Sequence, residues 1–280
     1  MTKQAPVRTR SWLFTPATRP ERFAKASQTG ADVAILDLED AVAPGDKARA
    51  RTTALDYLAE NPSDGALHAL RVNGLDTRAG ISDLEALLGS TAAPDFLVLP
   101  KTETAGHLEI LDRLLTAAGK ATRLIGLIES ARGLAAVEAI ATATPRLAGL
   151  MLGAADMAAD LGATVAWEPL AFVRCRLIAA CALASVVSVD SPYFDLHDEP
   201  GLKREVIGAV TFGFSAKAAI HPAQIGEINA ALTPSAEAVK RARAILAENT
   251  KGVGTVDGQM IDEAVARKAR RTLFSAGLEA

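Results

Sequence analysis

Two apolar runs that each end in an acidic residue constrain the fold of this chain more than any other feature. They are residues 124–129, LIGLIE, and residues 150–156, LMLGAAD. Both runs are continuously apolar, which is typical of parallel strands that are buried on both faces. The carboxyl ends of such strands meet at one edge of the sheet, where α/β barrels carry their active sites. We therefore expect Glu129 and Asp156 to converge at that edge.

Two negatively charged carboxylates from neighbouring strands need positive charge to balance them, and a single divalent cation bound between them is the simplest way to supply it. Mg²⁺ is commonly held by one or two carboxylates, with its other positions left for substrate and water. Each acid taken alone is also explained as a helix N-cap or a first-turn acid. The pair in consecutive units favours a metal site with Glu129 and Asp156 as ligands.

Composition bounds the class of protein. The chain has 280 residues, 49% of them hydrophobic, which suits one large core. A formal net charge of -3 argues against a nucleic-acid partner. The two cysteines, Cys175 and Cys181, lack metal-ligand spacing and indicate reduced, buried thiols of a cytoplasmic protein. The first residues, MTKQAPVRTR, contain no apolar signal core, and no apolar run reaches membrane-spanning length.

Strand-like and helix-like segments alternate eight times, which predicts an α/β fold of the TIM (β/α)₈ barrel type. The expected strands are residues 11–16, 33–39, 67–73, 95–101, 123–129, 147–153, 185–190 and 215–221. The expected helices are a short one from residue 19, then 47–58, 83–88, 107–118, 133–141, 169–183, 202–212, 225–232, 236–248 and 263–273. An open doubly wound sheet is the alternative, but no GxGxxG motif follows the first strand. We expect the barrel to occupy residues 1–249, and residues 250–280 to form a C-terminal helical extension that acts as a lid.

The expected strand ends form an acid-rich set. Its members are Pro16, Glu39, Asp40, Arg71, Lys101, Glu129, Asp156, Asp190 and His221. The planar guanidinium of Arg71 suits a substrate carboxylate or an oxyanion. A salt bridge to Glu39 or Asp40 is an equally good explanation of Arg71. Lys101 invites Schiff-base chemistry, but the acids around it would keep its amine charged.

These residues match a known family. The chain resembles the citrate lyase β-subunit-like branch of the HpcH/HpaI aldolase superfamily. The resemblance is carried by SWLFTPATRPERF, GADVAILDLEDAVAPGDKARAR, LRVNGLDT, DFLVLPKTET, LIGLIESARGL, GLMLGAADMAADLG, AKAAIHPAQI and GQMIDEAV. It implies a TIM barrel, Mg²⁺, and cleavage or formation of a carbon–carbon bond in a 3-hydroxyacyl thioester. It also implies a homo-oligomer, commonly a trimer.

The resemblance also assigns roles to residues. It makes Glu129 and Asp156 the metal ligands, Arg71 a substrate contact, and Arg19 a contact at the coenzyme A end. Two positions depart from the pattern, because many relatives have glycine at the position of Ala17 and an acid at the position of Ala155. These departures put the identity of the substrate in doubt more than the reaction class.

The working hypothesis is a lyase that interconverts citryl-, citramalyl- or malyl-CoA, or a similar thioester, with acetyl-CoA and a 2-oxo acid. Backbone N–H groups of Gly153, Ala154 and Ala155 would hold the oxo-acid carboxylate. Arg71 would stabilise the enolate oxygen.

Positive charge near the start of the chain suits the coenzyme phosphates, and Arg19 and Lys47 are the candidates. The group that transfers the proton is left open between Glu39 or Asp40, acting through water, and Asp262 of the extension. Asp262 is equally well explained as the N-cap of the helix that follows it.

Two other functions remain open at this stage. One is a metal aldolase that acts on free 2-oxo acids without coenzyme A. The other is a non-catalytic subunit of a lyase complex. The sequence does not identify the acyl group, nor does it distinguish coenzyme A from an acyl carrier protein as the thioester carrier.

Overall fold

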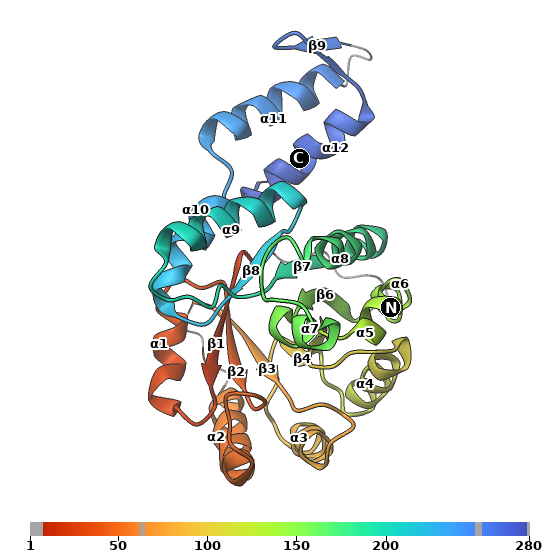
Figure 1. Cartoon of the computed structure of the whole chain (residues 1–280). Helices are drawn as coiled ribbons and strands as arrows, with labels where there is room; N and C mark the ends of the chain where they lie inside the picture. Colours follow the sequence, from red (N-terminus) through yellow and green to blue (C-terminus); the bar gives the residue numbers. More distant parts are fainter. Residues whose placement is uncertain (1–7, 61, 63–64, 250–253, 279–280) are drawn as a thin grey trace. The chain divides into compact units, whose positions relative to one another are not determined.

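Eight parallel strands close into a barrel in the computed structural model, which describes residues 8–60, 62, 65–249 and 254–278 (Figure 1). Each strand pairs with the next in sequence, and the first pairs with the eighth. The strands are β1 (Ser11–Pro16), β2 (Val33–Asp37), β3 (Leu67–Arg71), β4 (Phe96–Leu99), β5 (Arg123–Ile128), β6 (Leu147–Leu152), β7 (Val187–Asp190) and β8 (Ala216–Ala219). The predicted TIM barrel is confirmed.

Both faces of these strands are apolar, because one face fills the barrel and the other supports the surrounding helices. In β5, Ile125 and Leu127 belong to the inner cluster of buried side chains, whereas Leu124 and Ile128 pack in the outer cluster with the helices. The same alternation holds in β6, where Met151 points inward and Leu150 and Leu152 outward. This double burial explains the long apolar runs of β5 and β6 in the sequence.

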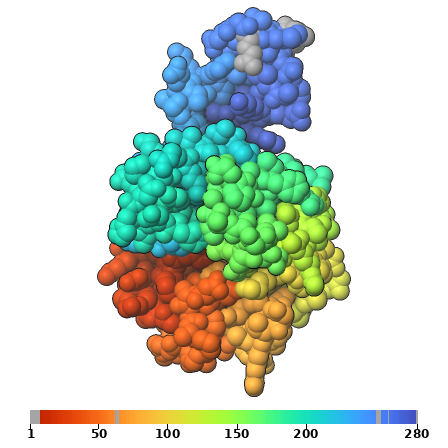
Figure 2. Space-filling view, viewed as in Figure 1, coloured from red at the N-terminus to blue at the C-terminus, as the bar shows by residue number. Residues whose placement is uncertain are grey.

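The helices that connect the strands lie outside the barrel, and Figure 2 shows the successive units by colour on the visible face of residues 8–228. They are η1 (Pro20–Arg22), α1 (Phe23–Ser27), η2 (Pro44–Asp46), α2 (Lys47–Ala59), α3 (Arg78–Gly89), α4 (Ala105–Ala117), α5 (Ala131–Ala135), α6 (Val137–Ala141), α7 (Ala154–Leu161), α8 (Ala171–Ala184) and α9 (Glu199–Phe212). After the last strand follow η3 (Pro222–Gln224) and α10 (Ile225–Leu232).

Several predicted boundaries are corrected by the structure. The helix expected at 83–88 begins at Arg78, because the Thr77 hydroxyl accepts a hydrogen bond from the Gly80 N–H (3.0 Å) and caps it. Helix α7 follows β6 directly and was not predicted. The predicted helix 133–141 divides into α5 and α6 at Ala136. Seven of the eight strands are one to three residues shorter than predicted.

The alternation along each strand also decides which residues at its end face the barrel mouth. Ile35 and Ala69 point inward, so Asp37 and Arg71, two residues later, point inward as well. Asp190 has the opposite parity, because Val189 points inward. Asp190 is fully buried outside the barrel, where it accepts hydrogen bonds from Lys217 Nζ (2.6 Å) and Arg174 Nε (3.0 Å). Its inclusion among the residues of the site edge was therefore wrong.

The chain divides into two compact units, residues 1–228 and residues 229–280. The second unit contains α11 (Ala236–Asn249), β9 (Gly254–Val256), β10 (Gln259–Ile261) and α12 (Glu263–Ser275). Ile245 of α11 clusters with Ala269 and Leu273 of α12, which is why the boundary differs from the expected one at residue 249.

Two expectations about the whole chain are also tested. No helix in the described part of the chain is both long and apolar enough to cross a membrane. Cys181 is buried and free, as predicted, whereas Cys175 is free but exposed.

Candidate active site

A pocket of about 400 Å³ opens at the carboxyl ends of the barrel strands. Its lining combines charged and apolar side chains. The polar residues are Asp37, Asp40, Arg71, Glu129 and Asp156, and the apolar ones include Phe14, Leu127, Met151, Leu152, Pro192, Phe194 and Ile220. The structure thus brings the two predicted metal ligands and the predicted anion-binding arginine to one cavity.

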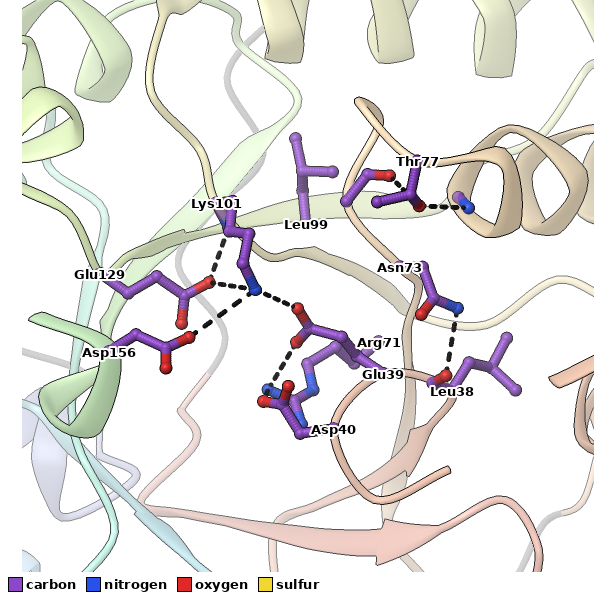
Figure 3. A network of polar contacts seen from close by, with 12 residues as sticks. Leu38, Glu39, Asp40, Arg71, Asn73, Thr77, Leu99, Lys101, Glu129 and Asp156 are labelled. Carbon is purple, nitrogen blue, oxygen red and sulfur yellow. Dashed lines mark hydrogen bonds and ion pairs between the residues drawn. The ribbon is translucent and has the colours of Figure 1, made fainter. Parts of the chain in front are cut away.

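The carboxylates of Glu129 and Asp156 both point toward the ammonium group of Lys101 (Figure 3). Lys101 Nζ lies 4.0 Å from Glu129 Oε1 and 3.7 Å from Asp156 Oδ2. It donates a hydrogen bond of 2.6 Å to Glu39 Oε1. The backbone N–H of Lys101 also donates to Glu129 Oε1 (2.7 Å), which fixes the orientation of that carboxylate.

Arg71 is held by three carboxylates, and the principal one was not predicted. Its Nε and Nη2 donate to the two oxygens of Asp37 at 2.6 and 2.7 Å, a bidentate geometry. Its Nη1 lies 3.0 Å from Glu39 Oε2 and 3.3 Å from Asp40 Oδ2. The expected ion pairs with Glu39 and Asp40 are therefore present, although the bidentate hydrogen bonds of the guanidinium go to Asp37. Alternate residues of β2 point into the barrel, and Asp37 follows Val33 and Ile35 in that series, so this alternation would have identified it.

Burial and unbalanced charge shift the protonation of these groups. Burial raises the pKa of Glu129 to about 8, and the nearby Glu39 carboxylate adds to the shift. Burial also raises the pKa of Glu39, although Arg71 and Lys101 oppose it. Burial by itself would lower the pKa of Lys101, but its hydrogen bond to Glu39 and the surrounding carboxylates outweigh burial and raise it. The five carboxylates and two cations of this cluster leave an excess of negative charge.

Gly153 stands between β6 and α7, where it gives the Glu129 side chain room. A Cβ at this position would lie 2.5 Å from both Cβ and Oε2 of Glu129, so alanine would displace the carboxylate. Asp156 lies in the first turn of α7, the place that the helix explanation had given it. Its carboxylate nevertheless faces Lys101, and its residue lines the pocket with Gly153, Ala154 and Ala155.

The loop after β2, which carries Glu39 and Asp40, is braced from two sides. Lys47 Nζ donates to the carbonyl oxygens of Leu38 (2.9 Å) and Glu39 (2.6 Å). The Asn73 side-chain amide donates to the same Leu38 oxygen at 3.1 Å and to Asp83 at 2.6 Å. The ammonium of Lys47 thus holds backbone carbonyls, a contact that the sequence did not predict for this coenzyme-binding candidate.

The other predicted site residues lie elsewhere. Arg19 precedes η1 with a largely exposed side chain, 3.8 Å from Glu21. Asp262 caps α12, where its Oδ1 accepts a hydrogen bond from the Val265 N–H (2.9 Å), as the N-cap alternative predicted. Asp262 belongs to the second compact unit.

The residues present fit a magnesium ion. Glu129 and Asp156 supply oxygen ligands, and one cation, the Lys101 ammonium, already lies within 4.0 Å of both. Among the described residues, no group of three or more His, Cys, Asp or Glu side chains is placed to hold a metal ion. A site of two carboxylates therefore leaves most coordination positions for substrate and water, as Mg²⁺ sites commonly do.

Comparison with known proteins gives one consistent result. The model of the HpcH/HpaI aldolase/citrate lyase family matches residues 10–222. A relative named L-malyl-CoA/beta-methylmalyl-CoA lyase, from Rhodobacter capsulatus, is 36% identical over 298 residues, covering 95% of this chain and 94% of its own. The crystal structure of RipC from Yersinia pestis is 58% identical with a TM-score of 0.74, covering 82% of this chain and 97% of that one. That of CitE from Mycobacterium tuberculosis in complex with magnesium, acetoacetate and coenzyme A is 36% identical with a TM-score of 0.80, covering 97% and 99%.

Proposed function

The chain belongs to the HpcH/HpaI aldolase/citrate lyase family, and from this premise we propose that it is a magnesium-dependent carbon–carbon lyase. It interconverts a 3-hydroxyacyl-CoA, such as citryl-, citramalyl- or malyl-CoA, with acetyl-CoA and a 2-oxo acid. The observation that carries the proposal is the convergence of Glu129 and Asp156 beside Arg71 in a pocket at the carboxyl ends of the strands. The relative named for malyl-CoA cleavage and the CitE complex with magnesium and coenzyme A support it.

Glu129 and Asp156 would hold the magnesium ion. When bound, it supplies Lewis-acid polarisation and a template for the 2-oxo acid. Gly153, Ala154 and Ala155 line the same pocket. The Gly153 N–H donates to the Ile128 carbonyl oxygen (3.0 Å), so Gly153 is removed from the predicted carboxylate donors. The N–H groups of Ala154 and Ala155, in the first turn of α7, would bind the oxo-acid carboxylate. Arg71 would stabilise the enolate oxygen that develops when the carbon–carbon bond breaks, and Asp37 keeps its guanidinium in place.

A proton must leave the substrate hydroxyl in the cleavage direction, and a carboxylate is the proposed acceptor. Asp40 lines the pocket and has a side chain that is 63% exposed, so water can reach it. Glu39 is buried and engaged by Lys101 and Arg71. Of these two, the geometry favours Asp40 as the group acting through water. Asp262 remains the candidate from the second unit.

A panel of condensation reactions tests the proposal. Acetyl-CoA or propionyl-CoA is incubated with glyoxylate, pyruvate or oxaloacetate, with and without Mg²⁺, and the thioester products are identified by mass spectrometry. We expect a new 3-hydroxyacyl-CoA for at least one pair, and only with Mg²⁺. Products from pyruvate and an aldehyde without any thioester would favour an aldolase independent of coenzyme A. No product and no effect of Mg²⁺ would favour a non-catalytic subunit.

Arg19→Ala is expected to raise the KM for the CoA ester several-fold while leaving the oxo-acid KM and kcat nearly unchanged. The exposed guanidinium is available to a phosphate, and a remote phosphate contact contributes mostly uniform binding. Steady-state kinetics with each substrate varied in turn measures this. Lys203→Ala, which removes an exposed charge from α9, is the matched control. An unchanged KM for the thioester would remove Arg19 from the coenzyme site.

Asp262→Asn separates the two roles proposed for that residue. Asparagine caps a helix as well as aspartate does, but it does not carry a proton. A catalytic role predicts that kcat falls at least about a hundredfold while the thermal stability is unchanged. Unchanged kcat would leave capping of α12 as the whole role of Asp262.

The remaining proposals concern assembly and location. We propose a cytoplasmic homo-oligomer, a trimer as the resemblance implies, in which the C-terminal unit acts as a lid over a barrel. Mixing Asp262→Asn subunits with Glu129→Ala subunits tests the arrangement. Recovery of activity supports a site shared between subunits, and no recovery supports a site within one subunit.

A further inference from the structure

Lys101 is the cation closest to the candidate metal ligands among the described residues, and the proposed reaction gives it no role. Its side chain enters the carboxylate cluster from the residue two positions after β4, and 44% of it is exposed. Its backbone has φ +49°, a conformation that non-glycine residues rarely adopt. A residue in such a strained conformation persists only where the surrounding structure stabilises it, and residues of this kind are frequent at functional sites.

The contacts of the ammonium group are unequal. Nζ makes one short hydrogen bond, to Glu39 Oε1 at 2.6 Å. Its separations from Glu129 and Asp156, 4.0 and 3.7 Å, exceed hydrogen-bonding distance. Lys101 therefore balances the charge of the two carboxylates electrostatically without hydrogen-bonding to either. The orientation of Glu129 depends instead on the backbone N–H of Lys101, which any residue other than proline would retain.

We infer that the Lys101 ammonium is the resident counter-ion of the Glu129–Asp156 pair and competes with the divalent cation for it. This inference rests on the proposed function, because it takes the pair to be the magnesium site. Two like charges within a few ångströms repel strongly in a partly buried site, so Lys101 weakens magnesium binding. In return, it stabilises three clustered carboxylates when no metal is bound. The exposed side chain has room to withdraw toward solvent when the metal enters.

The inference predicts opposite effects of one substitution. Lys101→Met removes the ammonium but keeps the backbone N–H and an unbranched side chain at the same φ. We expect its dissociation constant for Mg²⁺ to be at least about tenfold lower than that of the wild type. Without metal, we expect the variant to melt about 3 °C or more below the wild type. With saturating Mg²⁺, this difference should disappear or reverse.

The experiment is isothermal titration of MgCl₂ alone into metal-free protein, together with thermal melts with and without Mg²⁺. Neither readout requires activity. Lys203→Met is the matched control, because it removes the same charge from an exposed position of α9. Lys101→Arg keeps the charge and should retain the affinity of the wild type within a few-fold.

Two results would overturn the inference while leaving the magnesium site intact. One is equal or weaker Mg²⁺ binding by Lys101→Met than by the wild type. The other is a loss of thermal stability in Lys101→Met that is the same with and without Mg²⁺, which would make Lys101 a purely structural residue. If the wild type itself binds no Mg²⁺, the magnesium site of the proposed function fails, and the inference fails with it.

Discussion

Replacing Glu129 or Asp156 by alanine is expected to reduce magnesium-dependent turnover by about three orders of magnitude or more, since Lewis-acid stabilisation of several kcal/mol would be lost. The barrel should remain folded, because neither side chain belongs to the two apolar clusters that form its core. Each side chain faces the pocket, and each is one of only two proposed protein ligands. Loss of either residue therefore leaves the metal with a single protein ligand.

Initial rates with and without Mg²⁺ measure the effect, and titration of MgCl₂ in the presence of an oxo acid measures its cause. Asp56→Ala is the matched control, because it removes an acid from an exposed position of α2. It should retain nearly full turnover. Unchanged magnesium affinity in both Glu129→Ala and Asp156→Ala would remove the pair from the metal site.

Arg71→Lys has the second large expected effect, a decrease in kcat/KM of about 10²- to 10³-fold, the usual cost of losing one well-placed donor at a developing oxyanion. Lysine keeps the charge but loses the planar fork that binds both oxygens of Asp37. The ammonium of lysine cannot satisfy Asp37 bidentately and also keep the placement of Nη1 toward Glu39 and Asp40.

Stability must be measured alongside activity, because Arg71 is only 7% exposed and paired. A purely structural arginine predicts a lower melting temperature with a normal kcat/KM for the folded fraction. The proposed role predicts that kcat/KM falls even where the variant is fully folded. Asp37→Asn is a useful companion, since it loosens the guanidinium without removing it and should cost less activity than Arg71→Lys.

The barrel could be predicted from sequence because most strands are apolar on both faces, so they appear as nearly uninterrupted runs, with single polar residues such as His68 in β3 and Lys217 in β8. Apolarity on both faces also caused most errors in the strand boundaries, since an apolar run in the sequence does not indicate where hydrogen bonding to the next strand stops. Helix α7 was missed because its sequence, AADMAADL, is rich in small residues and follows Gly153 without a side-chain cap. Asp156 was assigned to the metal site, and a helix start entered only as the alternative explanation of that residue.

The turn at Asp257-Gly258 was a missed signal of a different kind. Asp-Gly is a strong indicator of a two-residue hairpin, and the structure joins β9 to β10 there with φ of +51° and +74°. The sequence was interpreted only as a helical extension over residues 250–280, so this hairpin was not predicted.

The site was only partly predictable for a related reason. Taking residues where apolar runs stop found Arg71, Glu129 and Asp156, but it passed over Asp37 inside a run and admitted Asp190 from the wrong face. The alternation of inward and outward residues along each strand places Asp37 inside the barrel and Asp190 outside it. The position of the Lys101 ammonium, in contrast, depends on a backbone conformation that the sequence does not reveal.

The central claim is that this pocket breaks a carbon–carbon bond in a magnesium-dependent reaction. The most direct measurement incubates the wild-type enzyme with malyl-CoA and citramalyl-CoA, with either Mg²⁺ or a chelator, and quantifies every product by mass spectrometry. We predict acetyl-CoA and the corresponding 2-oxo acid in equal amounts from at least one thioester, with Mg²⁺ only. Release of free coenzyme A and a hydroxy acid, or equal cleavage in the presence of the chelator, would contradict the claim.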